Sequence, residues 1–268
     1  MKFLAAAVQM LASSDKDANL KEAEARIREA AAKGAQLVAL PEVFNWRGEK
    51  GEEKLFAEQV PGPTSTLMAQ IAGQLNIFLL AGSILEELPG SNKVYNTSLL
   101  FDPRGRLLAR YRKIHLFDVQ IEGGVSTMES ETRQGGEEVV AAETELCRMG
   151  LTICYDLRFP ELFRALVAKG AELIFVPSAF TALTGEAHWE PLLRARAIEN
   201  QVYIIAPDQV GHNPKSFAAY GHSMMVDPWG RILARASDRP GVVFAEIDLT
   251  YLAKIRAQLP ALSHRKVF

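Results

Sequence analysis

Short apolar runs alternate along the chain with segments in which hydrophobic side chains recur every three or four positions. The apolar runs are rich in β-branched residues, which is typical of strands buried on both faces. They comprise residues 3–8, 36–40, 76–85, 150–155, 172–180 and 201–210. The periodic segments predict helices over residues 18–34, 65–75, 160–170 and 187–200. This alternation predicts one α/β domain over residues 1–268.

Two of the predicted helices carry boundary signals. The first has a candidate N-cap near Asp17 and ends at Gly34, and the third has Pro160 in its first turn and Gly170 just past its end. Proline suits a first turn because its missing N–H would have no partner there, and glycine is the residue that most often follows a helix. No stretch rich in proline, glycine and serine lies between the elements, so no linker divides the chain.

Two motifs each occur twice. AKGAQLVALP at 32–41 returns as AKGAELIFVP at 168–177, and FDPRGRLLAR at 101–110 returns as VDPWGRILAR at 226–235. In the second pair, proline and glycine are placed for a type I turn between apolar strands, which predicts a hairpin in each copy. The repeats indicate two similar halves facing each other. Two sheets with helices outside both would bury such strands.

Composition narrows the class of protein. The 268 residues are 48% hydrophobic and 23% charged, with a formal net charge of −2, as in a globular protein with a large core. Neither charge is in excess, which argues against a nucleic-acid or membrane-surface partner. The two cysteines, Cys147 and Cys154, are too few for a disulfide framework and form no zinc motif, so a reducing compartment is expected.

The first residues, MKFLAAAVQMLASS, could be taken for a signal peptide. However, Gln9 interrupts their apolar stretch, and Lys2 is the one basic residue before it. A buried first strand over residues 3–8 explains the same letters. No other run is long enough to span a bilayer, so we expect a cytoplasmic protein.

Three charged residues are candidates for a functional site because of their positions relative to the predicted strands and loops. Glu42 directly follows the apolar run 36–40, and α/β folds commonly bind ligands where buried strands end. Lys113 closes the hairpin strand RLLARYRK, and strand alternation puts it on the more apolar face. Glu129 lies in the polar stretch TMESETRQGG, where it could equally be an ordinary loop acid.

Cys154 lies in GLTICYDLRFPEL, between an apolar run and a predicted helix start. Free cysteine is among the most buried residue types, so inert packing is one interpretation. The other is a thiol held at a strand end for nucleophilic catalysis. Such a thiol needs a base or a cation beside it, because the thiolate is the reactive form. This segment alone leaves both interpretations open.

Three segments together resemble the signatures of the nitrilase superfamily, the carbon–nitrogen hydrolases. They are LPEVFNW around Glu42, YRKIHLFD around Lys113 and CYDLRFPE around Cys154, in the family's order and spacing. MES matches the segment with the family's second glutamate, Glu129. SAFTALTGEAHWEPLLRARAIENQ and YGHSMMVDPWGRILA resemble the Nit branch, which includes deaminated-glutathione amidases and ω-amidases. The resemblance implies an α/β fold, a single-domain αββα four-layer sandwich of two mixed sheets, and a homodimer or higher homo-oligomer.

The resemblance also implies a reaction. Glu42 would take the thiol proton of Cys154, and the sulfur would attack an amide carbonyl. Lys113 and the backbone N–H of Tyr155 would stabilise the oxyanion, and one such donor can contribute about 2.7–4 kcal/mol. Glu42 would then protonate the departing ammonia and activate water to hydrolyse the thioester. Glu129 would hold Lys113 or the substrate amide. No metal and no organic cofactor is required.

The resemblance places substrate-binding groups at Arg158, Phe180 and Thr181. Arg158 precedes a predicted helix, and a guanidinium beside a helix N-terminus makes a carboxylate site. An ion pair of Arg158 with Asp156 or Glu161 is the alternative. If Arg158 binds substrate, the substrate carries an acid group as well as an amide.

We therefore expect a thiol amidase for a small carboxylate-bearing amide, with deaminated glutathione as the first candidate substrate and α-ketoglutaramate as the second. A nitrilase or an N-carbamoyl amino acid hydrolase is the alternative within the superfamily. A non-catalytic scaffold is disfavoured, because every catalytic residue is present. The tail after Leu259 is expected to lie on a partner subunit. The conformations of loops 45–53 and 210–220, which shape the pocket, do not follow from the sequence.

Overall fold

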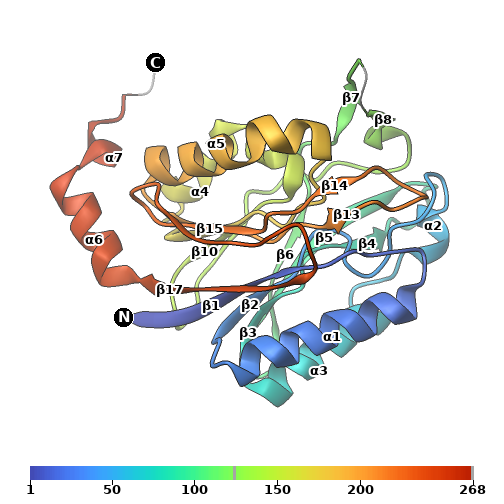
Figure 1. Ribbon diagram of the computed structural model, residues 1–268, viewed down its shortest axis with the longest axis horizontal. Helices are drawn as coiled ribbons and strands as arrows, with labels where there is room; N and C mark the ends of the chain where they lie inside the picture. Colours follow the sequence, from blue (N-terminus) through green and yellow to red (C-terminus); the bar gives the residue numbers. More distant parts are fainter. Residues whose placement is uncertain (123–124, 267–268) are drawn as a thin grey trace.

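Two sheets stack face to face, and helices cover the outer face of each (Figure 1). The computed structural model describes residues 1–122 and 125–266. The first sheet has the order β17 (Gly241–Asp248), β1 (Lys2–Gln9), β2 (Leu37–Ala39), β3 (Phe78–Leu80), β5 (Val94–Phe101), β4 (Ile84–Glu87), with β6 (Leu107–Arg112) also paired to β5. The second has the order β16 (Ile232–Arg235), β15 (Met224–Val226), β12 (Tyr203–Ala206), β11 (Leu173–Phe175), β10 (Met149–Leu151), β9 (Ala141–Ala142).

Both sheets mix parallel and antiparallel pairs, and each is covered by two helices. Helices α1 (Lys16–Ala32) and α3 (Pro63–Leu75) lie on the first sheet, and α4 (Pro160–Ala168) and α5 (Ala182–Asn200) lie on the second (Figure 1). The predicted four-layer αββα sandwich is confirmed.

Strand β1 shows why the buried runs are apolar at every position. Ala5 and Ala7 belong to the core between the sheets, whereas Ala6 and Val8 belong to the core beneath α1 and α3. Successive side chains point to opposite faces of a sheet, and here both faces are covered. Strict alternation of polar and apolar residues is therefore absent.

The internal repeats occupy equivalent places in the two sheets. The first motif pair forms β2 and β11, each between two parallel neighbours. The second pair forms the antiparallel hairpins β5–β6 and β15–β16, as predicted. In each turn an aspartate side chain accepts two backbone N–H bonds, at 2.9 and 2.8 Å for Asp102 and at 2.8 and 2.9 Å for Asp227. The interpretation of two similar halves is confirmed.

Helices α1, α3 and α5 begin two to five residues earlier than predicted. The N-cap of α1 is Asp15, whose carboxylate accepts the N–H of Ala18 at 3.0 Å, and not Asp17. Helix α5 begins at Ala182 instead of residue 187, with Thr181 as its N-cap and Gly185 packed closely in its first turn. A Cβ at Gly185 would lie 2.3 Å from the ring carbon Cγ of Tyr220.

The predicted strand over residues 76–85 is two strands, β3 and β4. Gly82 separates them with φ +29°, and a Cβ at this position would lie 1.9 Å from the carbonyl oxygen of Pro41. Only glycine permits this approach. It brings the turn between β3 and β4 against the residue that precedes Glu42.

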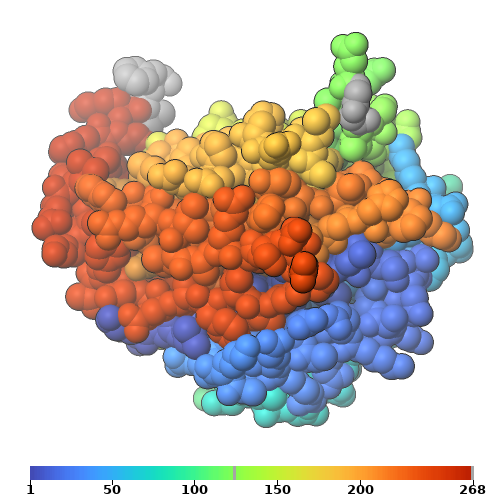
Figure 2. Space-filling model, viewed as in Figure 1, coloured from blue at the N-terminus to red at the C-terminus, as the bar shows by residue number. Residues whose placement is uncertain are grey.

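Smaller elements surround the sandwich. They are α2 (Glu53–Phe56), the strand pair β7 (Asp118–Gln120) and β8 (Ser126–Met128), the pair β13 (Val210–Gly211) and β14 (Ala219–Tyr220), α6 (Leu249–Gln258) and α7 (Ala261–His264). The β7–β8 pair and the C-terminal segment stand out from the body at opposite ends of the face in Figure 2. No helix in the described part of the chain is both long and apolar enough to cross a membrane. The contact of the tail with a partner subunit stays a prediction, and residues 267–268 of that tail lie outside the described residues.

Candidate active site

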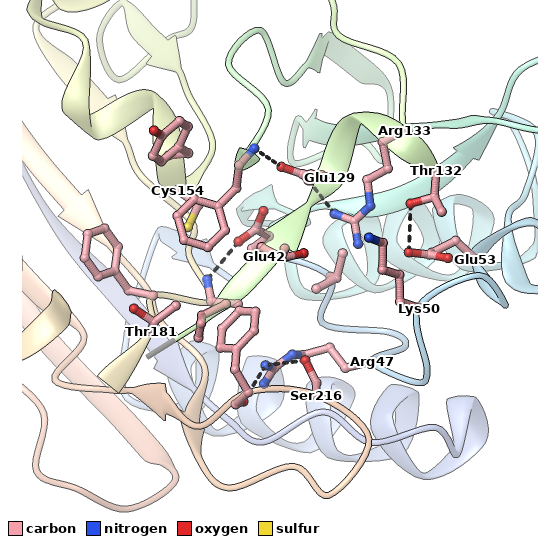
Figure 3. A pocket seen from close by; sticks show the side chains of 18 of the residues that line it. Glu42, Arg47, Lys50, Glu53, Glu129, Thr132, Arg133, Cys154, Thr181 and Ser216 are labelled. Atoms are coloured by element: carbon pink, nitrogen blue, oxygen red, sulfur yellow. Dashed lines mark hydrogen bonds and ion pairs between the residues drawn. The ribbon is translucent and has the colours of Figure 1, made fainter. Parts of the chain in front are cut away.

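One cavity of about 450 Å³ is lined by every residue that the sequence singled out for function. Its lining includes Glu42, Lys113, Glu129, Cys154, Tyr155, Arg158, Phe180 and Thr181. The cavity lies where strands end, since Glu42 follows β2, Lys113 follows β6, and Cys154 follows β10. Figure 3 shows the side chains of Cys154, Glu42 and Glu129 in its wall. Both halves of the sandwich therefore contribute to one site.

Glu42 is held by donors alone. Its Oε1 accepts from Lys113 Nζ at 3.0 Å and from Asn96 Nδ2 at 2.8 Å, and its Oε2 accepts from the backbone N–H of Ala179 at 2.9 Å. The residue is 4% exposed. A buried carboxylate surrounded by donors in this way is an acceptor-only group, the form that can receive a proton.

Lys113 lies between two carboxylates. Its Nζ donates to Glu42 Oε1 at 3.0 Å and to Glu129 Oε2 at 2.9 Å. Burial by itself would lower the pKa of Lys113, but Glu129 and Glu42 outweigh burial and raise the pKa above its usual value. The ammonium is therefore permanent at neutral pH, and it cannot serve as the base of a reaction.

Glu129 anchors that ammonium. It also accepts from Arg133 Nη1 and from the backbone N–H of Phe117, both at 2.6 Å. Burial by itself would raise the pKa of Glu129, but the charges of Lys113 and Arg133 outweigh it and lower the pKa to about 2. The carboxylate stays ionised. It lies in the short 3₁₀ helix Glu129–Glu131, not in an irregular loop.

Cys154 begins a tight turn directly after the second sheet. It is the first residue of the 3₁₀ helix Cys154–Arg158, with φ +47°, and its N–H donates to the carbonyl of Pro177 at 3.0 Å. A positive φ is uncommon for a residue other than glycine, and such conformations cluster at functional sites. The next N–H, that of Tyr155, stands in the first turn of the helix, where no intrahelical carbonyl is available to it.

The thiol of Cys154 rests in its protonated form. Burial raises its pKa well above the usual value, the carboxylate of Glu42 adds to the shift, and Lys113 opposes it. A nucleophilic role therefore needs a base that removes the proton when substrate is bound. Glu42, whose charge acts on this thiol, lines the same cavity.

Arg158 is available to a ligand. Its guanidinium packs on the rings of Phe180 at 5.3 Å and Tyr155 at 5.8 Å, and Nη1 lies 3.3 Å from His188 Nδ1. In the part of the chain that the structure describes, it forms no ion pair with Asp156 or Glu161. Asp156 instead binds Tyr111 and His115.

Phe180 and Thr181 follow β11 and form one wall of the cavity. The N–H of Phe180 donates to Asp208 Oδ1 at 2.9 Å, which fixes the backbone beside Cys154. Thr181 is the N-cap residue of α5, and its Oγ1 lies 2.6 Å from that of Thr184. Both positions are thus rigidly held.

Two participants in the charge network were missed from the sequence. Asn96 lies in the buried strand β5. A polar residue in a buried strand is a sequence signal that could have identified it. Arg133 follows Glu129 by four positions, a spacing that pairs side chains across one helical turn. Among the described residues, no group of three or more histidine, cysteine or acidic side chains is arranged to hold a metal ion.

Residues 4–257 match the carbon–nitrogen hydrolase family, and the chain belongs to this family. Its members are hydrolases that act on carbon–nitrogen bonds other than peptide bonds. The resemblance seen in the three sequence segments is thereby confirmed.

Named relatives fall into two groups of amidases. The chain is 44% identical over 265 residues to omega-amidase NIT2 of Xenopus tropicalis, covering 99% of this chain and 95% of the relative. It is 44% identical over 266 residues to the deaminated glutathione amidase of Synechocystis sp. (strain PCC 6803 / GT-S), covering 98% of each chain.

Two solved structures show the same fold. Nit3 of Saccharomyces cerevisiae, a member of branch 10 of the nitrilase superfamily, has a TM-score of 0.88 at 37% identity, with 97% of this chain and 94% of that chain covered. A mutant of the amidase from Nesterenkonia sp. AN1, in which acrylamide has added to the active-site cysteine, has a TM-score of 0.79 at 28% identity, with 96% and 98% covered.

Proposed function

We propose that the chain is a thiol amidase that hydrolyses the amide C–N bond of a small carboxylate-bearing substrate through a thioester on Cys154. The observation that carries this proposal is the chain of contacts from Glu42 through Lys113 to Glu129 in the cavity that Cys154 lines. The two named groups of amidase relatives support it, as does the acrylamide adduct on the cysteine of the Nesterenkonia enzyme.

Acylation begins with a proton transfer. Glu42 takes the proton from Cys154 Sγ, and the thiolate attacks the amide carbonyl carbon. The oxyanion is stabilised by Lys113 Nζ and the N–H of Tyr155, and each such donor can contribute about 2.7–4 kcal/mol. The C–N bond then breaks, Glu42 returns its proton to the departing nitrogen, and the acyl group stays on sulfur as a thioester.

Deacylation uses the same carboxylate. Glu42 removes a proton from water, and the hydroxide attacks the thioester carbonyl. The oxyanion forms again between Lys113 and Tyr155, and its collapse releases the acid and the Cys154 thiolate, which regains the proton from Glu42. Throughout, Lys113 supplies charge and transfers no proton, because Glu129 keeps it an ammonium. These steps need no metal and no organic cofactor.

The substrate carries an acid as well as an amide. Arg158 lines the cavity beside Phe180 and Thr181, with no acidic partner within residues 1–122 and 125–266, and these three residues bind the acyl part of the substrate. Deaminated glutathione is our first candidate and α-ketoglutaramate our second, in keeping with the two kinds of named relatives. We further propose that residues 1–268 form a single domain, that the enzyme is a homodimer or higher homo-oligomer, and that it acts in the cytoplasm.

A substrate panel tests the proposed function. Purified enzyme is incubated with deaminated glutathione, α-ketoglutaramate, aliphatic nitriles and N-carbamoyl amino acids, and the products are followed by mass spectrometry. We expect turnover of the two carboxylate-bearing amides. Turnover of nitriles or carbamoyl compounds alone would replace the amidase assignment with one of the other superfamily activities.

A further inference from the structure

Buried side-chain nitrogens and oxygens that lack a hydrogen-bond partner are distributed differently around the cavity. Among the described residues, the unpaired buried side-chain nitrogens are Trp46 Nε1, Arg47 Nη1 and Arg133 Nε, and all three residues line the cavity. None of the unpaired buried oxygens belongs to a lining residue. Unpaired buried donors are rare and costly in native proteins. The lining therefore favours a ligand that is rich in acceptors.

Arg47 differs from Lys113 and Arg133 of the lining in its hydrogen-bond partners. Its Nη2 donates to Ser216 Oγ at 3.2 Å and to the carbonyl of Phe217 at 3.1 Å, and both of these acceptors are neutral. Arg133, in contrast, donates to the carboxylate of Glu129. Arg47 is 5% exposed, so its charge is buried. The carboxylates of Glu42 and Asp208 act on this charge, but among the described residues none lies within ion-pair distance of it. A buried charge without a direct ion pair points to an anion that arrives with the ligand.

Arg47 stays charged and is flexible enough to meet that anion. Burial lowers the pKa of Arg47 to about 10, which leaves the guanidinium protonated at neutral pH. Nη1 is at the far end of a long side chain, and rotamer changes on binding are common. Nη1 itself is buried, and a rotation of the side chain would present it to a carboxylate in the cavity that the residue lines.

We propose that Arg47 is a second anion site of the cavity and that it binds a carboxylate on the amine that leaves. The inference rests on the proposed amidase function and adds the substrate class. The preferred substrate is then a secondary amide with an acid on each side of the scissile bond, not a primary amide that releases ammonia.

The side of the cavity on which Arg47 lies supports the leaving amine as its ligand. In the view of Figure 3, Glu42 lies between Cys154 and Arg47. Glu42 protonates the departing nitrogen, so the amine leaves on the Glu42 side of the sulfur. The acyl part remains on Cys154, beside Arg158 of the same 3₁₀ helix. Arg47 thus binds the acid of the leaving amine, and Arg158 binds the acid of the acyl part.

A matched pair of substrates tests this site without any mutation. Deaminated glutathione and its C-terminal carboxamide differ in one charge on the leaving amine, and α-ketoglutaramate has the same acyl group with no substituent. We expect wild-type kcat/KM to be at least about tenfold higher for the carboxylate than for the carboxamide, the size expected for a hydrogen-bonded charge. Equal values, or turnover of α-ketoglutaramate alone, would overturn the inference.

Variants then assign the preference to Arg47. Arg47→Met should lose the discrimination between carboxylate and carboxamide, and Arg47→Lys should keep part of it. Arg239→Met, at an arginine side chain that is 86% exposed, is the matched control and should keep the wild-type ratio. Thermal unfolding reports whether each variant is folded. If Arg47→Met lowers kcat/KM by the same factor for all three substrates, Arg47 only stabilises the loop of Ser216 and Phe217, and the inference is overturned.

The failure of this inference differs from a failure of the proposed function. If the wild-type enzyme hydrolyses none of the three amides, the amidase assignment itself is wrong. If it hydrolyses them without regard to the C-terminal charge, the amidase assignment stands and the second anion site does not. Inhibition by the product dipeptide gives a second readout, since its carboxylate form should bind at least about tenfold more tightly than its carboxamide.

Discussion

Tyr111 Oη donates a 2.6 Å hydrogen bond to Asp156 Oδ2, and this bond joins a residue two positions before Lys113 to one two positions after Cys154. The same carboxylate accepts from the N–H of Ile153 at 2.8 Å. Asp156 is fully buried. It therefore fixes the strand that carries the ammonium against the turn that carries the thiol.

Asp156→Asn should lower kcat at least about tenfold with a smaller change in KM. The amide oxygen can still accept from Tyr111 and Ile153, but the NH2 group then replaces the oxygen that accepts the N–H of His115, so two donors face each other and the turn of Cys154 is held less firmly. Steady-state kinetics with the best substrate separates kcat from KM. Asp238→Asn, at a side chain that is 81% exposed, is the control. An effect on KM alone would show that Asp156 does not position the reacting groups.

Cys154→Ala should abolish hydrolysis while the protein stays folded, because no other group of the cavity can form the thioester. Cys147→Ala is the matched control, since Cys147 is also free and buried but does not line the cavity. Activity and thermal unfolding are measured for both variants. Normal rates in Cys154→Ala would remove the nucleophile from the mechanism.

Lys113→Met should lower kcat by about 10²–10³-fold and also destabilise the fold. The variant removes an oxyanion donor and leaves Glu42 and Glu129 buried without their shared cation. Breaking a buried pair in this way costs about 3–5 kcal/mol, against at most about 1 kcal/mol for an exposed pair. Denaturant unfolding of Lys113→Met and of the control Lys2→Met, which breaks the exposed pair with Glu246, checks the contrast. If the two variants lose the same unfolding free energy, the buried network does not stabilise the fold more than the exposed pair does.

The fold should lose stability in acid through Glu129. Its pKa is lowered from 4.5 to about 2 in the folded protein, so its contribution is fully present above about pH 4.5 and is lost as the pH falls toward 2. Glu129→Gln should therefore flatten the dependence of the unfolding free energy on pH in this window, by up to about 1.4 kcal/mol per pH unit. Glu246→Gln, at an exposed carboxylate, should leave the slope unchanged.

Much of the fold was predictable because its signals are local. The buried strands, the two hairpin turns at Asp102 and Asp227, and the proline and glycine that bound α4 are all visible within short stretches. The start of α1 was placed wrongly although its cap is local, since Asp15 accepts the N–H of Ala18 only three positions further on. The first turn of α5 packs through Gly185 against Tyr220, which lies in a different element and so is not visible in a short stretch.

The candidate site was predictable only as separate residues. The motifs around Glu42, Lys113 and Cys154 are specific when taken together, so the sequence alone identified the family. It gave no sign that Arg47 would meet Ser216 and Phe217, because loops 45–53 and 210–220 have no periodic pattern.

The sequence by itself determined which segments are buried, where the chain turns and which residues have reactive side chains, because burial and turn geometry depend on neighbouring residues. Only the tertiary structure decided that one ammonium bridges two carboxylates that lie 71 and 16 positions away along the chain. Such contacts depend on how two sheets stack, and that packing sets the local charge and burial that control each pKa.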